Sequence, residues 1–155
     1  MLIDVSTAEK RSGVAAVIGA WISGCKADGF DAVEIDNLDS YSRSSGLLTE
    51  DDAVATLALF AKAAHDAGLA IAQKNSSELV SRRAEMGTDF AVAEECNRYS
   101  ECDAYTGGYG DHVIVIEYRK SDFTTGCSAF PNLSIVLRDV DLTTPSDSAY
   151  VYDGC

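Results

Sequence analysis

Short apolar segments that end in polar side chains recur along the chain, and this repetition limits its possible folds more than any other feature. Helical patterns separate most of these segments. Strands that alternate with helices form parallel sheets, in which the loops after the strands carry the functional side chains. The sequence therefore predicts an α/β fold. The predicted strands lie within residues 2–5, 30–41, 69–75, 90–96, 113–118 and 134–139.

Capping residues and apolar residues at helical spacing predict two helices between the early strands. One begins at Thr49 and Asp52, which form the pattern of a capping box, and ends at Gly68, a residue type that commonly terminates helices. The other ends at Gly29, and we expect its apolar stripe to pack in the core. The stripe comprises Val14, Val17, Ile18, Trp21, Ile22 and Cys25.

The middle of the chain is less regular. A third helix is predicted over residues 77–85, with Gly87 as its stop. Residues 100–110 are predicted to form a loop with at most one helical turn. Strands and helices nevertheless alternate along most of the sequence, which favours a parallel sheet.

The chain is short for the barrel that this alternation suggests. A complete TIM-type (β/α) barrel has eight strands and about 250 residues, whereas this chain has 155 residues. Asp36 and Glu94 lie 94 − 36 = 58 residues apart, which fits two strand–helix units of about 30 residues each. We therefore predict one domain over residues 1–155, an incomplete parallel barrel with about six of the eight strands. Because the sequence begins at Met1 inside a strand and without a signal-peptide leader, the first two strands are expected to be missing.

The first long polar segment places two acids on one face of a strand. Alternate residues of a strand share a face, so Glu34 and Asp36 point the same way while Val33 and Ile35 take the opposite, helix-covered face. Burying an unpaired carboxylate is costly. We therefore expect both acids to face the barrel interior or a ligand crevice. A structural salt-bridge network is the alternative.

Five pieces of the sequence, taken in order, resemble a known family. They are Leu2-Ile3-Asp4, residues 29–41, Lys74-Asn75, Ala93-Glu94-Glu95-Cys96 followed by Tyr99, Glu101 and Cys102, and Glu117-Tyr118. Together they resemble glycoside hydrolase family 114, the endo-α-1,4-polygalactosaminidases and related barrel proteins. Ile35, Ala93 and Glu95 stand where the family has proline, asparagine and glutamine. None of these departures removes a candidate catalytic acid.

This resemblance implies hydrolysis of α-1,4 linkages in galactosamine-containing polysaccharide, without a cofactor. Cleaving a glycosidic bond requires one acid to protonate the leaving oxygen and a second carboxylate opposite it. Asp36 and Glu94 are the predicted pair, with Glu94 as general acid/base and Asp36 as nucleophile or water-activating base. Their separation, about 5 Å or about 6.5–9.5 Å, decides between retention and inversion.

Further polar residues at strand ends are predicted to contact the substrate. Lys74 shares a strand face with Ala70 and Ala72, and we expect it to pair with Glu34 or Asp36, a purely structural ion pair being the alternative. Asparagine and aspartate are also common turn formers. Asp4 and Asp139 are secondary candidates. The predicted substrate contacts are Glu34, Asn37, Asp39, Tyr41, Lys74, Asn75, Glu117 and Tyr118.

Charge narrows the class of partner. The chain has 25 acidic and 12 basic residues, a net charge of −13, which disfavours nucleic acid and favours cationic partners. A deacetylated galactosamine polymer is cationic. The apolar runs are far shorter than the roughly 20 residues of a membrane span, so no membrane span is predicted.

The five cysteines favour an oxidising compartment and an extracellular parent protein. Cys96 and Cys102 are close enough in sequence to close a small loop beside the general acid, and we expect them to be bonded. We expect Cys127 to join Cys155. Cys25 is interpreted as a buried free thiol.

Two other functions remain open. Zinc requires closely spaced cysteine and histidine ligands, and neither His65 nor His112 has a cysteine nearby, so no metal site of that kind is predicted. A magnesium-dependent enzyme would instead use carboxylate oxygens. The other alternative is a non-catalytic carbohydrate-binding remnant of the barrel. The carboxylates available to magnesium are Glu34, Asp36, Asp39 and Glu94.

Overall fold

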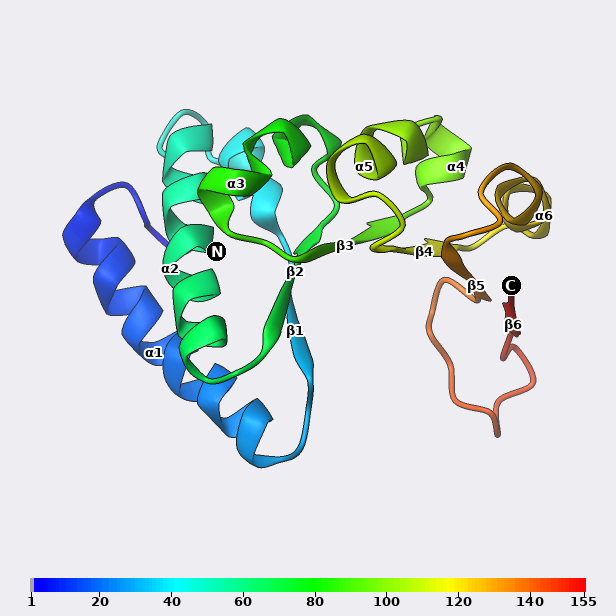
Figure 1. The fold of residues 1–155 in the computed structure, drawn as a ribbon, viewed down its shortest axis with the longest axis horizontal. Helices are drawn as coiled ribbons and strands as arrows, with labels where there is room; N and C mark the ends of the chain where they lie inside the picture. Colours follow the sequence, from blue (N-terminus) through cyan, green and yellow to red (C-terminus); the bar gives the residue numbers. More distant parts are fainter. Residues whose placement is uncertain (1) are drawn as a thin grey trace. The chain divides into compact units, whose positions relative to one another are not determined.

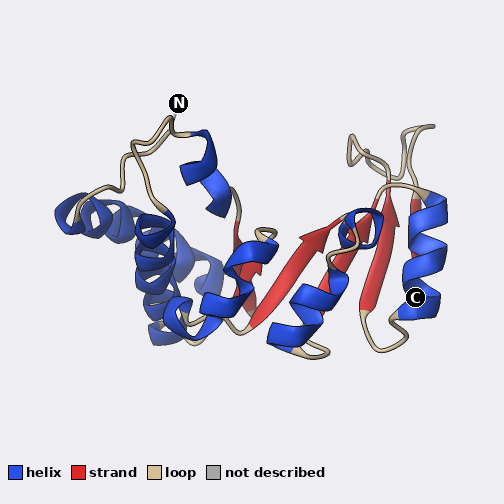
Figure 2. Cartoon of the chain, turned by 90° about the horizontal axis from the view of Figure 1, so that it is seen from above, coloured by secondary structure: helices blue, strands red, loops and turns tan. Residues whose placement is uncertain are grey.

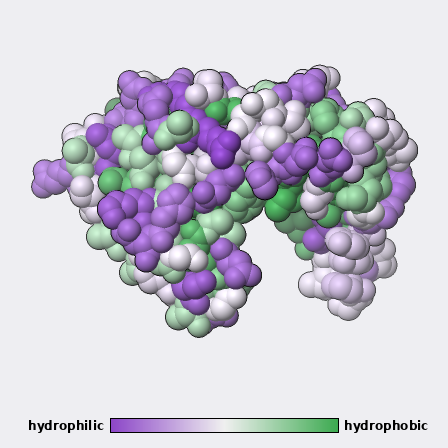
Figure 3. All heavy atoms as spheres, in the orientation of Figure 1, coloured by the Kyte–Doolittle hydropathy of each residue, from purple (hydrophilic) through white to green (hydrophobic). Residues whose placement is uncertain are grey.

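The structure is a computed structural model that describes residues 2–155, so Met1 lies outside the described residues. The chain divides into two compact units, one ending at Phe90 and the other running from Ala91 to Cys155 (Figure 1). Helices and strands alternate in both units (Figure 2). Hydrophilic residues cover much of the visible face in Figure 3, as expected for a chain with 24% charged residues.

The first unit contains two parallel strands and the helices that accompany them. β1 pairs with β2 in parallel, with Val33 opposite Ile71 and Glu34 opposite Ala72. The predicted order of strands and helices is thus confirmed here. The elements are α1 (Ala8–Ala27), β1 (Ala32–Ile35), the 3-10 helix η1 (Leu38–Arg43), α2 (Glu50–Asp66), β2 (Ala70–Lys74), the 3-10 helix η2 (Ser77–Arg82) and α3 (Arg83–Met86).

The core of the first unit decides which way its strands face. Val33 and Ile35 are half-buried against a cluster that includes Leu57 of α2 and Ile71 of β2. Glu34, between them, is exposed. The predicted division of β1 into an apolar, helix-covered face and an acidic face is therefore confirmed.

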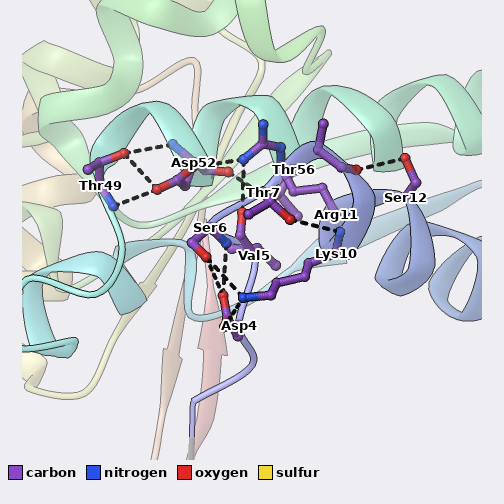
Figure 4. A network of polar contacts seen from close by, with 11 residues as sticks. Asp4, Val5, Ser6, Thr7, Lys10, Arg11, Ser12, Thr49, Asp52 and Thr56 are labelled. Atoms are coloured by element: carbon purple, nitrogen blue, oxygen red, sulfur yellow. Dashed lines mark hydrogen bonds and ion pairs between the residues drawn. The ribbon is translucent and has the colours of Figure 1, made fainter.

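The N-terminus of α2 has the predicted capping box. Asp52 donates its backbone N–H to Thr49 Oγ1 at 3.2 Å, and Thr49 returns its own N–H to Asp52 Oδ2 at 3.0 Å. Figure 4 shows that Asp52 also accepts a hydrogen bond from Arg11 Nη1 of α1, at 2.8 Å. One carboxylate therefore starts α2 and joins it to α1. Gly68 follows α2 with a φ of +74°, a conformation that glycine adopts without strain.

The predicted apolar stripe of α1 is only partly buried, which is a correction. Ile22 is buried, but Val17 and Trp21 are 52% and 66% exposed. α1 approaches α2 through Gly19, whose position lies within 3.5 Å of Ala63 Cβ when a Cβ is built on it. Since small residues permit this close approach, α2 packs toward the Gly19 and Ile22 side of the stripe. Val17 and Trp21 are left at its other margin.

The predicted strand at residues 2–5 is also wrong. These residues are irregular, and Leu2 and Ile3 are exposed. A strand is stable only when a neighbour satisfies its backbone groups. Asp4 instead accepts hydrogen bonds from the N–H and hydroxyl of Ser6 and from Lys10 Nζ, local bonds that compete with a strand.

The second unit is built on parallel strands with one antiparallel addition. β3 (Phe90–Glu94) leads into the unit and pairs with β4 (Val113–Glu117), which pairs with β5 (Ser134–Arg138), all in parallel. β6 (Tyr152–Gly154) pairs antiparallel with β5. The helices are α4 (Cys96–Tyr99), α5 (Cys102–Tyr109) and α6 (Lys120–Ala129).

Two features of this unit differ from the prediction. Residues 102–109 form a helix and not a loop, because Cys102, Tyr105 and Tyr109 recur at helical spacing and are all buried. That stripe is the signal that would have revealed the helix. β6 was not predicted. Cys155 exchanges backbone hydrogen bonds with Ile135 of β5, which extends the sheet by a strand too short to show a pattern in sequence.

Candidate active site

Asp36, one of the two predicted catalytic acids, directly follows β1 in the first unit. Its side chain is 60% exposed and accepts hydrogen bonds from Lys74 Nζ at 3.5 Å and from Asn37 Nδ2 at 3.3 Å. Lys74 ends β2, and its side chain is only 7% exposed. The predicted pairing of Lys74 with a carboxylate of β1 is confirmed, and the partner is Asp36. A nearly buried cation therefore lies beside the predicted nucleophile or base.

An asparagine in the left-handed conformation follows each strand of the first unit, one or two residues after its end. Asn37 has a φ of 59° and Asn75 a φ of 52°. Asparagine adopts this conformation more readily than most residues, so the turn-forming role noted for these asparagines is present. The turns also place both amide side chains directly after the strand ends, where we predicted substrate contacts.

The 3-10 helix η1 carries the next two predicted contacts. Asp39 forms an ion pair with Arg43, and Arg43 Nη2 donates to Asn37 Oδ1 at 3.0 Å. Tyr41 donates its hydroxyl to Glu78 Oε1 at 2.5 Å. Burial, and then this carboxylate, raise the pKa of Tyr41 above that of an ordinary tyrosine. Arg43 was not predicted, although its position four residues after Asp39 was a signal for the pair.

A cavity of about 540 Å³ lies beside these residues within the first unit. This volume is in the range of small-molecule sites, which combine apolar walls with a few polar groups. Asp36, Asn37, Tyr41 and Arg43 therefore meet at one concave surface. The apolar part of its wall includes Val14, Leu57 and Phe60.

Glu94 ends β3 in the second unit and is held by a tyrosine. Tyr118 donates its hydroxyl to Glu94 Oε1. Glu94 lies opposite Ile116 in the β3–β4 ladder, and Tyr118 is two residues further along, so the two side chains share a face. Burial, followed by the bond to Glu94, raises the pKa of Tyr118. Tyr118 thus contacts the predicted general acid directly.

Glu117 is buried and not accessible to a substrate, which corrects the prediction that it contacts the polysaccharide. Glu117 is fully buried. It shares a face of β4 with the buried residues Val113 and Val115, and this face is opposite to the one that Tyr118 takes. Its Oε1 accepts the backbone N–H of Asn97 at 2.9 Å. Burial is the main cause that raises the pKa of Glu117 above its usual range. A side chain without accessible surface does not touch a polysaccharide.

The two predicted disulfides are present. Cys96 is bonded to Cys102, directly after the strand that carries Glu94, and Cys127 is bonded to Cys155. Cys25 is free, as predicted, but it is half-buried rather than buried. Its side chain packs at the edge of the first unit's core.

Within residues 2–155, no group of three or more histidine, cysteine, aspartate or glutamate side chains is arranged to hold a metal ion. The same residues include no helix with the length and apolar character needed to cross a membrane. Asp36 lies in the first unit and Glu94 in the second. Their pairing across a glycosidic bond stays a prediction.

Comparison with known proteins agrees with the resemblance seen in the sequence. The sequence model of glycoside-hydrolase family GH114 matches residues 1–155. The crystal structure of Aspergillus fumigatus Ega3 in complex with galactosamine is similar to this chain, with a TM-score of 0.78 and 24% sequence identity. No curated protein sequence matches the chain.

The structural match covers nearly all of this chain but only part of the Ega3 chain. It covers 98% of this chain but 63% of the Ega3 chain, so the chain spans less than two thirds of that protein's length. At this level of identity the likeness shows the fold. It confirms the predicted class, an α/β structure of the incomplete barrel type.

Proposed function

Because the chain belongs to glycoside-hydrolase family GH114, we propose that it hydrolyses glycosidic bonds in a galactosamine-containing polysaccharide, at α-1,4 linkages. The observation that carries the proposal is the family match over the whole chain. The side chains that end β1 and β3 support it, since each of these strands presents one carboxylate with a polar partner.

In this proposal the two carboxylates share the chemistry of glycoside hydrolysis. Glu94 protonates the leaving oxygen as the glycosidic bond breaks. If Asp36 attacks the sugar as nucleophile, Glu94 then acts as base for the water that hydrolyses the covalent glycosyl-enzyme; if Asp36 instead activates the water, the single displacement needs no second step from Glu94. The hydroxyl of Tyr118 holds the carboxylate of Glu94 in one orientation. The ammonium of Lys74 lies beside Asp36 and donates a hydrogen bond to its carboxylate.

The proposed substrate is a cationic polymer of galactosamine. The net charge of −13 favours a positively charged partner, and the similar structure of Ega3 contains galactosamine. The cavity beside β1 supplies amide, phenol and carboxylate groups suited to sugar hydroxyls and amines. The proposed contacts are Glu34, Asn37, Asp39, Tyr41, Lys74, Asn75 and Tyr118, with Glu117 left out.

We further propose that the parent protein is secreted. Two disulfides join four of the five cysteines. Disulfides form and persist mainly in oxidising compartments outside the cytosol. Detection of the protein in culture medium, with both disulfides intact by mass spectrometry of unreduced peptides, is the expected result.

The hydrolase proposal is tested by measuring new reducing ends after incubation with partly deacetylated galactosamine polymer. Asp36→Asn and Glu94→Gln are each expected to lower the rate about 100-fold or more, since each removes a group that transfers protons or attacks. Asp66→Asn and Glu9→Gln make the same chemical changes at exposed sites on α2 and α1 and should leave the rate unchanged. Cleavage retained in both site variants would refute the assignment.

The same assay separates the alternatives. Binding of the polymer without new reducing ends would support a non-catalytic carbohydrate-binding remnant of the barrel. Loss of cleavage in the presence of a chelator, restored by magnesium, would support a magnesium-dependent enzyme. We expect the chelator to have no effect.

A further inference from the structure

Glu117, the last residue of β4, and Tyr118, which follows it, contact different parts of the chain at the end of β3: Tyr118 bonds to Glu94 and Glu117 to Asn97. Tyr118 donates its hydroxyl to the side chain of Glu94. Glu117, on the other face, accepts the backbone N–H of Asn97 at the start of α4, which follows the turn after Glu94. The strand that supplies the partner of the proposed general acid therefore also fixes the chain beyond it.

The contact with Glu117 lies just after the turn that follows Glu94. Glu95 has a φ of 55°, an uncommon conformation for a residue other than glycine. The chain then enters α4, and Glu117 Oε1 accepts the N–H of Asn97 at 2.9 Å. Asn97 Nδ2 donates to the carbonyl of Asp122 at 2.8 Å, which ties the same turn to the start of α6.

The burial of Glu117 is energetically unfavourable, more so than a purely structural role requires. It is fully buried, and its Oε2 has no hydrogen-bond partner among the residues that the structure describes. Burial of a carboxylic acid with an unsatisfied oxygen is destabilising, and the nearby Asp122 and Glu95 add like charge. An apolar side chain of similar size would fill the same space without this penalty. The carboxyl group therefore has a use that offsets its burial.

We propose that Glu117 is a positioning residue for Glu94. Through the N–H of Asn97 it fixes the turn after β3, and this keeps the carboxylate of Glu94 against the hydroxyl of Tyr118. The inference rests on the proposed function, because positioning matters only if Glu94 takes part in catalysis. Glu117 itself touches no substrate.

The geometry is tested without reference to activity by NMR of protein labelled with ¹³C at the tyrosine ζ carbon. The signal of Tyr118, assigned with Tyr118→Phe, reports the hydrogen bond that its hydroxyl donates. Glu94→Gln defines the position of this signal without the carboxylate. Glu117→Ala is expected to move the signal toward that position. Glu117→Gln keeps an oxygen that accepts the N–H of Asn97 and should leave the signal near its wild-type position.

Ile135→Val is the matched control, since it weakens the buried core of the second unit and removes neither partner of the bond between Asn97 and Glu117. A structural role alone would make Glu117→Ala resemble this control, with lower stability and an unmoved Tyr118 signal. That result would overturn the proposal.

Kinetics provide the second measurement. Glu117→Ala is expected to lower kcat about 100-fold with little change in KM, because a small displacement of a catalytic group reduces the rate of the chemical step. Glu117→Gln is expected to restore most of kcat, and Ile135→Val to retain it. Equal kcat in wild type and Glu117→Ala would contradict the inference. If the wild-type chain does not cleave the polymer, the proposed function fails, while the NMR measurement still decides whether Glu117 positions Glu94.

Discussion

Replacing Asp52 by alanine removes the carboxylate that starts α2 and joins it to α1. The substitution deletes the hydrogen bonds that Asp52 accepts from Thr49 and the ion pair with Arg11. Both partners of the ion pair are largely buried, with side-chain exposures of 18% for Arg11 and 15% for Asp52. Loss of a capping interaction costs about 1 kcal/mol, and loss of a hydrogen bond to a charged group costs about 1.5–3 kcal/mol. The first unit should lose about 2.5–4 kcal/mol of stability.

The pH dependence of this loss has a definite sign. The bond from the Thr49 hydroxyl, together with Arg11, lowers the pKa of Asp52 in the folded protein. A lowered pKa contributes stability that is fully present above the unfolded pKa of about 3.9 and is lost as the pH falls through the folded pKa. The difference between wild type and Asp52→Ala is therefore expected to be largest near neutral pH and to shrink below about pH 4.

Urea unfolding followed by the fluorescence of Trp21 and by circular dichroism measures this difference. Trp21 is the sole tryptophan of the sequence and lies on α1, so its signal reports the first unit. Asp66→Ala is the control, because it breaks an exposed ion pair with Lys62 and should change stability by less than about 0.5 kcal/mol. Equal urea midpoints for Asp52→Ala and Asp66→Ala at neutral pH would refute the reasoning.

Three further predictions concern the fold and the site. Replacing both Cys127 and Cys155 by serine opens a loop of 28 residues and should lower the free energy of unfolding by about 3.5 kcal/mol in the chain-entropy description, as measured by urea unfolding with and without the disulfide. Ile22→Ala should cost about 2–5 kcal/mol in the same assay because Ile22 is buried, whereas Trp21→Ala should cost less than about 1 kcal/mol because Trp21 is exposed. Tyr118→Phe removes the hydroxyl that holds the proposed general acid and should lower kcat about tenfold while binding of the polymer persists, a pattern that steady-state kinetics will detect or exclude.

Local patterns in the sequence predicted several local features around the candidate site. The alternation of β1 predicted that Glu34 faces away from Val33 and Ile35, and the capping box of Thr49 and Asp52 located the start of α2. Alternation and capping depend on residues within a few positions of one another. They are therefore visible before the chain folds.

The same rule, applied to β4, also predicts the burial of Glu117. Glu117 lies on the same face of the strand as Val113 and Val115, which are buried, and on the opposite face from Tyr118. The prediction that Glu117 contacts substrate was wrong because a polar residue at a strand end was taken as accessible without regard to its face.

Other features were decided only by the tertiary structure. Val17 and Trp21 belong to the apolar stripe of α1 but remain exposed, because Gly19 allows α2 to pack on the other side of that stripe. Lys74 had two candidate partners of equal chemistry, and the pairing of β1 with β2 brought it to Asp36. The sequence by itself determined the long helices and the central strands, together with the acidic face of β1, since these follow from local spacing. Tertiary packing alone decided which apolar side is covered and which ions meet, because those outcomes depend on contacts between segments far apart in the chain.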